Sequence, residues 1–166
     1  MRERSPKPRC STNVLWPLAD ARGSDSDSYF LMDQTFRLRV VTPNRQVVTE
    51  DVEEAQVPGK EGYMGILPGH APLLSELKVG ELTYRQGKQA HHLAVSGGFL
   101  EVLPDQVTVL AETAEKMGEI DAERARAAKE RAEKRLRSPD PDVDINRAGV
   151  ALERALIRLQ VASKRR

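Results

Sequence analysis

The spacing of apolar residues changes once along this chain, near residue 118. Before that point the stretch "TFRLRVVTP" alternates, with Phe36, Leu38 and Val40 on one side of a predicted strand. After it, "EIDAERARAAKERAEKRLR" (119–137) is rich in Ala, Glu, Lys and Arg, which are strong helix formers. A period of two is typical of half-buried strands and a period near 3.6 of amphipathic helices. The chain is therefore predicted to be mainly β, with a C-terminal α part.

Turn residues divide the β part into short strands. Gln86-Gly87-Lys88 predicts a hairpin turn, Gly97-Gly98 a corner or bulge, and Pro104-Asp105 a second turn. Turn signals about every ten residues indicate antiparallel sheets. We therefore expect residues 32–117 to form an antiparallel β-sandwich or flattened barrel.

Residues 118–166 are predicted to form an antiparallel two-helix hairpin, with helices at about 119–137 and 145–163. Asp121 is a candidate N-cap, and the two prolines of "SPDPD" (138–142) end the first helix. Small and aliphatic residues form the stripes by which the helices should face each other, namely Ala148, Leu152, Ala155, Leu156, Leu159 and Ala162 against Ile120, Ala125, Ala128, Ala132 and Leu136. This core is thin, so we expect the hairpin to need another surface to hold one conformation.

Residues 1–31 differ from the rest, being charged, rich in Ser and Pro and without periodicity. Such a composition predicts a disordered extension, and we expect Met32 to be the translation start. The single cysteine, Cys10, excludes an internal disulfide and a cysteine-based zinc site. No apolar run approaches the roughly 18–20 residues of a membrane span.

Charge is divided unevenly along the chain. Residues 32–118 carry 12 acidic and 8 basic side chains, whereas residues 119–166 carry 9 acidic and 13 basic ones. A basic tail on an acidic body suggests that the tail meets an acidic surface, the alternative being a solvated helical face. Aromatic residues make up only 4% of the chain, and the strands lack the interleaved aromatics of a nucleic-acid stacking platform. We therefore expect no nucleic-acid partner.

Catalytic and metal-binding patterns are missing from the sequence. The glycine-lysine pairs lack the remainder of a phosphate-binding loop, and no histidine-glutamate spacing suggests a metal site. Ser96 in "AVSGG" resembles a nucleophile elbow, but all three histidines precede it, against the order of that machinery. We expect no catalytic residue, no metal and no required cofactor.

The segment "GILPGHAPLL" (65–74) places Pro68 and Pro72 in an apolar run. Proline fixes φ and removes a backbone donor, so this stretch is predicted to be a rigid loop. Either its aliphatic side chains close the end of the sandwich, or the loop is offered to a partner.

The segments "VPGKEGYMGILPGHAPLL", "VSGGFLEV", "VTVLAETAE" and "RALIRLQVA" resemble the epsilon subunit of F-type ATP synthases, from about residue 35 to residue 164. The resemblance implies a β-sandwich followed by a two-helix hairpin. It also implies a non-catalytic subunit of the central stalk that couples the gamma subunit to the c-ring in proton-driven ATP synthesis. Membrane association would arise only through the complex, on the cytoplasmic side of the bacterial plasma (inner) membrane.

The resemblance also implies a contact surface for the c-ring and gamma near residues 59–72. Its expected members are Glu61, Tyr63, Pro68, Gly69 and His70.

Some members of this family bind ATP through a motif that this chain carries as Ile120-Asp121-Ala122-Glu123-Arg124-Ala125. Arginines can bind phosphate oxygens through charge-assisted hydrogen bonds. The expected ATP-binding residues are Glu115, Ile120, Asp121, Arg124, Ala125, Arg131, Arg154 and Arg158. The alternative is that Asp121 only caps the helix and the arginines only keep it soluble.

The resemblance further implies that the hairpin inhibits ATP hydrolysis when it extends toward the alpha and beta subunits. Arg147, Arg154 and Arg158, together with Lys164, would then contact acidic residues of beta, and ATP would act as a regulatory ligand of the folded hairpin. A free-standing ATP-sensing module is the alternative function.

Overall fold

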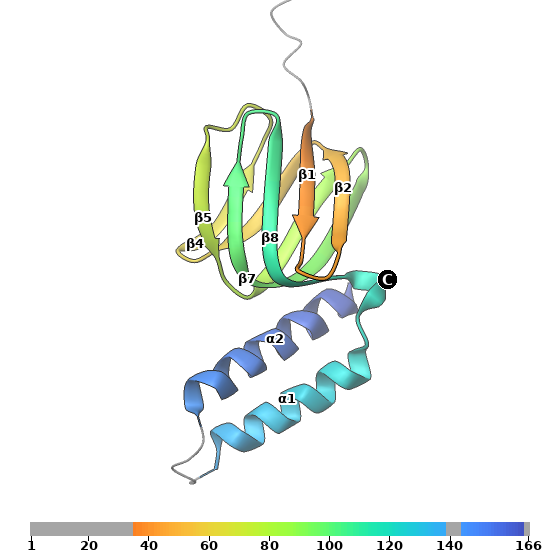
Figure 1. Cartoon of the computed structure of the whole chain (residues 1–166). Helices are drawn as coiled ribbons and strands as arrows, with labels where there is room; N and C mark the ends of the chain where they lie inside the picture. The colour runs from red at the N-terminus through yellow and green to blue at the C-terminus, as the bar shows by residue number, and fades with distance from the viewer. Residues whose placement is uncertain (1–34, 139–143, 165–166) are drawn as a thin grey trace, which may run out of the picture. The chain divides into compact units, whose positions relative to one another are not determined.

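The strands and helices occupy two successive parts of the chain in the computed structural model, which describes residues 35–138 and 144–164 (Figure 1). The predictions of a disordered extension and of a start at Met32 lie outside the described residues, as does most of the predicted helix stop at 138–142. The described residues form one compact unit.

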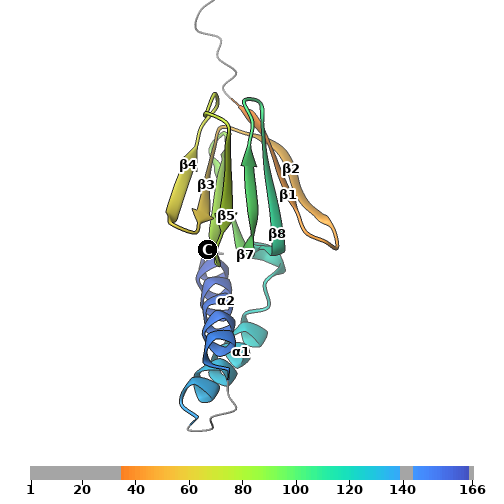
Figure 2. The same ribbon diagram turned by 60° about the vertical axis from the view of Figure 1, so that its left-hand side comes forward.

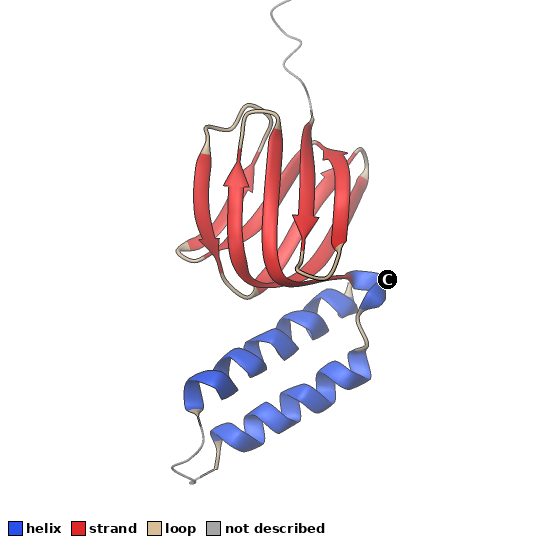
Figure 3. Cartoon of the chain, viewed as in Figure 1, coloured by secondary structure: helices blue, strands red, loops and turns tan. Residues whose placement is uncertain are grey.

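Eight strands precede the helices. Figure 3 colours the strands red and the helices blue. The strands are β1 (Phe36–Val41), β2 (Gln46–Val52), β3 (Glu54–Gly59), β4 (Gly62–Ile66), β5 (Leu73–Leu77), β6 (Gly80–Gln86), β7 (Gln89–Val102) and β8 (Gln106–Lys116). They are followed by a 3₁₀ turn (Met117–Glu119), α1 (Ala122–Leu136) and α2 (Ile145–Ser163). The predicted fold class, a β-sandwich followed by two helices, is confirmed.

Strand β7 passes from one side of the sandwich to the other. Its first half pairs with β6 as far as Val95, and its second half pairs with β5 from Gly98 onward. Between these halves Gly97 and Gly98 have φ angles of 59° and 110°, which are accessible to glycine but strained for other residues. The predicted corner is confirmed, and the register with β8 is the same on both sides of it, so the strand bends without a bulge.

One strand pairing was not predictable from turn signals. β1 pairs with β2 antiparallel and with β8 in parallel, so that Leu38 lies opposite Val107. The other described strand pairs are antiparallel. Because β1 and β8 are joined through all the intervening strands and not by a tight turn, their pairing can be parallel.

The core lies between the two sides of the sandwich and is built from Val and Leu, as the composition requires. The predicted inward face of β1 is confirmed, since Phe36, Leu38 and Val40 are all buried. Further fully buried large side chains are Ile66, Leu82, Leu93, Leu100, Val52, Val57, Val95, Val102, Val107 and Val109. Each such side chain contributes about 1.5–3 kcal/mol to stability through burial.

Helix α1 begins at Ala122, three residues later than the sequence pattern predicts. The preceding residues form the 3₁₀ turn, and Ile120 is extended, with φ −75° and ψ 122°. Asp121 then caps the helix, because its Oδ1 accepts from the Arg124 N–H at 3.0 Å. Asp144 caps α2 in the same way, accepting from the Arg147 N–H at 2.9 Å.

The two helices lie side by side and run in opposite directions, with α2 next to the sandwich and α1 beyond it (Figures 1 and 2). Ala125, Ala132, Ala148 and Ala155 are buried where the helices meet, which confirms the predicted alanine contact. The predicted stripe of α2 is wrong at one position. Leu156 is 43% exposed, whereas Val161, outside the predicted stripe, is fully buried against the sandwich.

Candidate functional site

A small apolar cluster joins α2 to the sandwich. Ala94 of β7, Ile120 and Val161 are buried together, with Met117, Ile157 and Ala162 packed partly against them. The cluster is much smaller than the sandwich core. We call this arrangement, with α2 against β6 and β7, the docked hairpin.

Ion pairs supplement this cluster. Arg154 donates to Glu112 Oε2 at 2.7 Å and to Ser96 Oγ at 2.6 Å. Arg158 binds both carboxylate oxygens of Glu115, at 2.7–3.1 Å. The three basic residues of the docked face, Arg154, Arg158 and Lys164, therefore all meet carboxylates of the sandwich.

Glu81, at the start of β6, is the most buried of these carboxylates, at 6% exposure. It receives hydrogen bonds from Lys164 at 2.7 and 3.0 Å and from Gln160 at 3.0 Å, and His92 Nδ1 lies 2.6 Å from it. Burial by itself would raise the pKa of Glu81, but the bonds from Lys164 and His92 outweigh it and hold the pKa below its ordinary value. Glu81 is therefore a charged anchor for the end of α2.

A cleft of about 420 Å³ lies where the start of α1, the end of β8 and the β1–β2 turn come together. Its walls are mostly charged. They are formed by Arg45, Glu115, Glu119, Asp121, Arg124, Ala125, Ala128, Arg131 and Arg158. We call it the arginine cleft.

The arginine cleft gathers six of the eight residues that the sequence predicts for ATP: Glu115, Asp121, Arg124, Ala125, Arg131 and Arg158. The other two lie elsewhere. Ile120 belongs to the apolar cluster, and Arg154 is bound to Glu112 and Ser96. Arg45, Glu119 and Ala128 were not predicted.

The charges of the arginine cleft are only partly balanced within the chain. Glu115 is bound by Arg158, Glu119 by Arg45, and Asp121 by the backbone of α1. Within the described part of the chain, the side chains of Arg124 and Arg131 form no ion pair. Two unpaired guanidinium groups in a cleft of this size suit a phosphate-bearing ligand.

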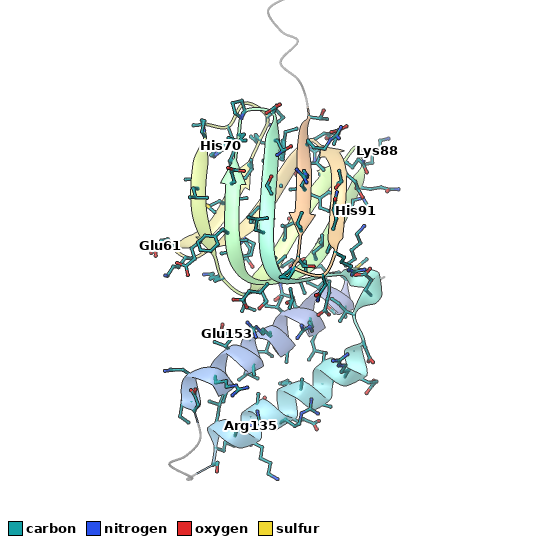
Figure 4. The ribbon with its side chains drawn as sticks, in the orientation of Figure 1. Glu61, His70, Lys88, His91, Arg135 and Glu153 are labelled. Atoms are coloured by element: carbon teal, nitrogen blue, oxygen red, sulfur yellow. The ribbon has the colours of Figure 1, made fainter. Side chains whose placement is uncertain are left out.

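The predicted contact residues near 59–72 do not form one patch. Glu61 and His70 lie at opposite ends of the sandwich (Figure 4), because β4 runs between them. Tyr63 is 50% exposed, and its hydroxyl accepts from the Glu81 N–H at 3.3 Å. Pro68 and Gly69 lie beside His70, at the end of the sandwich away from Glu61. The His70 N–H donates to the Leu67 carbonyl oxygen and closes a turn there.

The segment 65–74, predicted to be a rigid loop, is a loop only at 67–72, because Gly65 and Ile66 end β4 and Leu73 and Leu74 begin β5. Ile66 is buried in the core and closes the end of the sandwich. Leu67, Leu73 and Leu74 are exposed large apolar side chains, with Leu74 at 73%. The segment therefore completes the core with one of these side chains and presents the other three to solvent.

The remaining predicted residues lie apart from these groups. Arg147 is exposed in the first turn of α2 and does not join Arg154 and Arg158. Ser96 is buried and accepts from Arg154, which does not suit a nucleophile. Across residues 35–138 and 144–164, no group of three or more His, Cys, Asp or Glu is placed to hold a metal ion, and no helix is long and apolar enough to cross a membrane.

Comparison with known proteins gives the same architecture. Residues 35–117 match the family "ATP synthase, Delta/Epsilon chain, beta-sandwich domain", and residues 119–163 match "ATP synthase, Delta/Epsilon chain, long alpha-helix domain". The fold is thus that of an ATP synthase delta/epsilon chain.

Comparison with individual relatives narrows the class from delta/epsilon chains to epsilon chains. The chain is 51% identical over 133 residues to the ATP synthase epsilon chain of Syntrophobacter fumaroxidans, covering 80% of this chain and 99% of the relative. It is 50% identical over 134 residues to that of Solibacter usitatus, covering 81% and 100%. The chain belongs to the epsilon-chain family of ATP synthases.

Chains in two solved structures are also similar to this chain. A chain in the cryo-EM structure of the Euglena gracilis mitochondrial ATP synthase OSCP/F1/c-ring matches with a TM-score of 0.70 and 25% identity, covering 93% of this chain and 99% of that one. A chain in the central stalk/c-ring structure from Tetrahymena thermophila shares the fold, with a TM-score of 0.50 and 15% identity, covering 79% and 96%. The chain thus has the fold of chains found in these two ATP synthase structures.

Proposed function

We propose that this epsilon chain is a non-catalytic subunit of the rotor, which couples gamma to the c-ring and whose hairpin reversibly inhibits ATP hydrolysis. One observation carries the regulatory part. The basic face of α2 is held to the sandwich by carboxylates and a small apolar cluster, and not by a large core. The assembly would lie on the cytoplasmic side of the bacterial plasma membrane, associated with it only through the complex.

Such an interface can open at limited cost. Arg154 and Glu112 are both well exposed, and Arg158 and Glu115 are only partly buried. Exposed ion pairs exchange protein partners for water with little change in free energy. The undocked α2 would expose Arg154, Arg158 and Lys164 together, and these cations would bind acidic residues of the beta subunits and block rotation.

ATP is proposed to favour the docked hairpin by binding in the arginine cleft. The cleft takes its walls from α1, α2 and the sandwich, so that it exists as a unit only while the hairpin is docked. A ligand shifts a two-state equilibrium by its difference in affinity for the two states. Abundant ATP would then release the inhibition, and scarce ATP would permit it.

Deleting residues 119–166 tests the inhibition. We expect faster ATP hydrolysis by the assembled enzyme and unchanged ATP synthesis, and an unchanged hydrolysis rate would contradict the proposal. The opposite change is expected from Glu81→Gln, which loosens docking without altering the cleft. This variant should hydrolyse ATP more slowly than wild type, whereas Glu130→Gln, on the exposed surface of α1, should not.

Co-purification separates the proposal from a free-standing ATP-sensing module. A rotor subunit should travel with gamma through affinity purification and gel filtration, whereas an independent sensor should not. The exposed Leu67, Leu73 and Leu74 favour the rotor subunit, because a sensor has no use for this apolar surface.

A further inference from the structure

We propose that Arg45, in the turn between β1 and β2, is a further anion-binding residue of the arginine cleft, through which a nucleotide's phosphates tie α1 to the sandwich. This inference rests on the proposed function, in that it takes ATP as the ligand of the cleft. Arg45 lies outside the sequence motif and outside the hairpin.

The backbone at Arg45 is fixed by the turn that carries it. The Thr42 N–H donates to the Arg45 carbonyl at 2.9 Å, and the Thr42 hydroxyl donates to the same oxygen at 3.0 Å. The Arg45 N–H in turn lies 3.2 Å from Thr42 Oγ1. A side chain on so constrained a turn loses less conformational entropy when it binds a ligand.

Glu119 holds the Arg45 side chain at the cleft. Arg45 Nη2 lies 2.5 Å from Glu119 Oε2, and the same carboxylate accepts from the Lys116 N–H at 3.2 Å. A guanidinium has five N–H donors, and the pair with Glu119 uses one of its nitrogens. With about half of its side chain exposed, Arg45 retains donors for a second anion.

Arg45 is also well placed to link two parts of the chain. α1 makes its extensive contacts with α2 and not with the strands. Arg124 and Arg131 project from α1 into the arginine cleft, and Arg45 lines it from the sandwich. A polyphosphate bound by all three would bridge α1 and β1–β2 directly, which a monophosphate is too short and too weakly charged to do as well.

Calorimetric titration of the full chain with ATP, ADP and inorganic triphosphate tests this inference. Arg45→Ala should raise the Kd for ATP about tenfold, the size expected for losing one charge-assisted contact, and Arg45→Lys should lie between this variant and wild type. Arg37→Ala is the matched control, because Arg37 forms a similarly exposed ion pair with Asp51 on the same two strands but away from the cleft. Its Kd should equal that of wild type.

Glu119→Gln provides a change of opposite sign. Its amide oxygen can still accept from the Lys116 N–H, but it no longer neutralises Arg45, so ATP should bind severalfold more tightly. If Arg45 acts only by holding Glu119 in place, the double variant Arg45→Ala/Glu119→Gln will bind like Glu119→Gln, and the inference is wrong. If Arg45 contacts the phosphates, the double variant will bind about tenfold more weakly than Glu119→Gln.

Failure of the two proposals can be told apart. ATP that binds wild type and Arg45→Ala equally overturns the role of Arg45 and leaves the cleft as the ATP site. A wild-type chain that binds no ATP overturns both.

Discussion

Lys164, at the C-terminal cap of α2, donates to both carboxylate oxygens of Glu81, at 2.7 and 3.0 Å. The two residues are 83 positions apart, and Glu81 is buried whereas Lys164 remains partly exposed. The contact therefore fastens the free end of the hairpin to the first residues of β6. It is the most buried ion pair between the hairpin and the sandwich among the described residues.

Glu81→Gln should loosen the end of α2 without unfolding the sandwich. The amide keeps the shape of the carboxylate but carries no charge and has one acceptor oxygen instead of two. Lys164 and Gln160 therefore lose part of their hydrogen bonding to this side chain. Removing one partner of a buried hydrogen-bonded group costs about 1–3 kcal/mol. Amide hydrogen exchange should show faster exchange at residues 158–163 and unchanged exchange in β7. Glu112→Gln is the control, because its pair with Arg154 is exposed and should contribute little.

Docking should weaken in acid because of the same carboxylate. The folded-state pKa of Glu81 is lowered, since the hydrogen bonds from Lys164 and His92 outweigh burial. Its contribution to stability is therefore complete above the ordinary value of 4.5 and is lost as the pH falls through the folded-state value. NMR shifts of α2 amides should report undocking below that pH. The same titration of Glu81→Gln should lack this step, and an identical step would contradict the assignment.

Gly98→Ala should prevent the corner in β7 from forming. A Cβ at Gly98 would lie 1.9 Å from the Leu110 carbonyl oxygen, at a φ of +110°. The strained backbone and the clash with β8 should together cost more than about 3 kcal/mol. Urea unfolding should show a large fall in midpoint or no folded protein. Gly65→Ala is the control, because a Cβ added at Gly65 would have no atom within 4 Å and the φ of this residue is unstrained. The urea midpoint of this variant should change little.

Local patterns in the sequence were sufficient for most of the fold. The alternation of Phe36, Leu38 and Val40 correctly predicts the buried face of β1, and Gly97-Gly98 correctly predicts where β7 bends. Each of these features depends on neighbours in the chain. The parallel pairing of β1 with β8 depends on the path of all the strands between them, and no turn residue in the sequence predicts it.

The candidate site likewise contains residues that a local sequence pattern predicts and residues that no such pattern predicts. Asp121, Arg124 and Ala125 line one wall of the arginine cleft, and they could be predicted because they belong to one short sequence motif. Arg45 lies 74 residues before Glu119, and its turn has no feature that distinguishes a cleft residue from an ordinary exposed arginine. Glu81 likewise resembles any charged strand residue until α2 covers it.

Asp121 gives a final test, because it caps α1 and is also a predicted ATP ligand. Asp121→Ala should destabilise α1 by about 0.5–2 kcal/mol through loss of the cap, so weaker ATP binding in that variant would not show which role matters. Asp121→Ser keeps an oxygen that accepts from the Arg124 N–H but removes the carboxylate. If Asp121 binds ATP, Asp121→Ser should retain the helix by circular dichroism and lose ATP affinity by calorimetry. If Asp121 is only a cap, Asp121→Ser should bind ATP like wild type. Asp144→Ser, the same change at the N-cap of α2 and away from the cleft, should leave both measurements unchanged, so that a loss confined to Asp121→Ser reflects the carboxylate and not the cap.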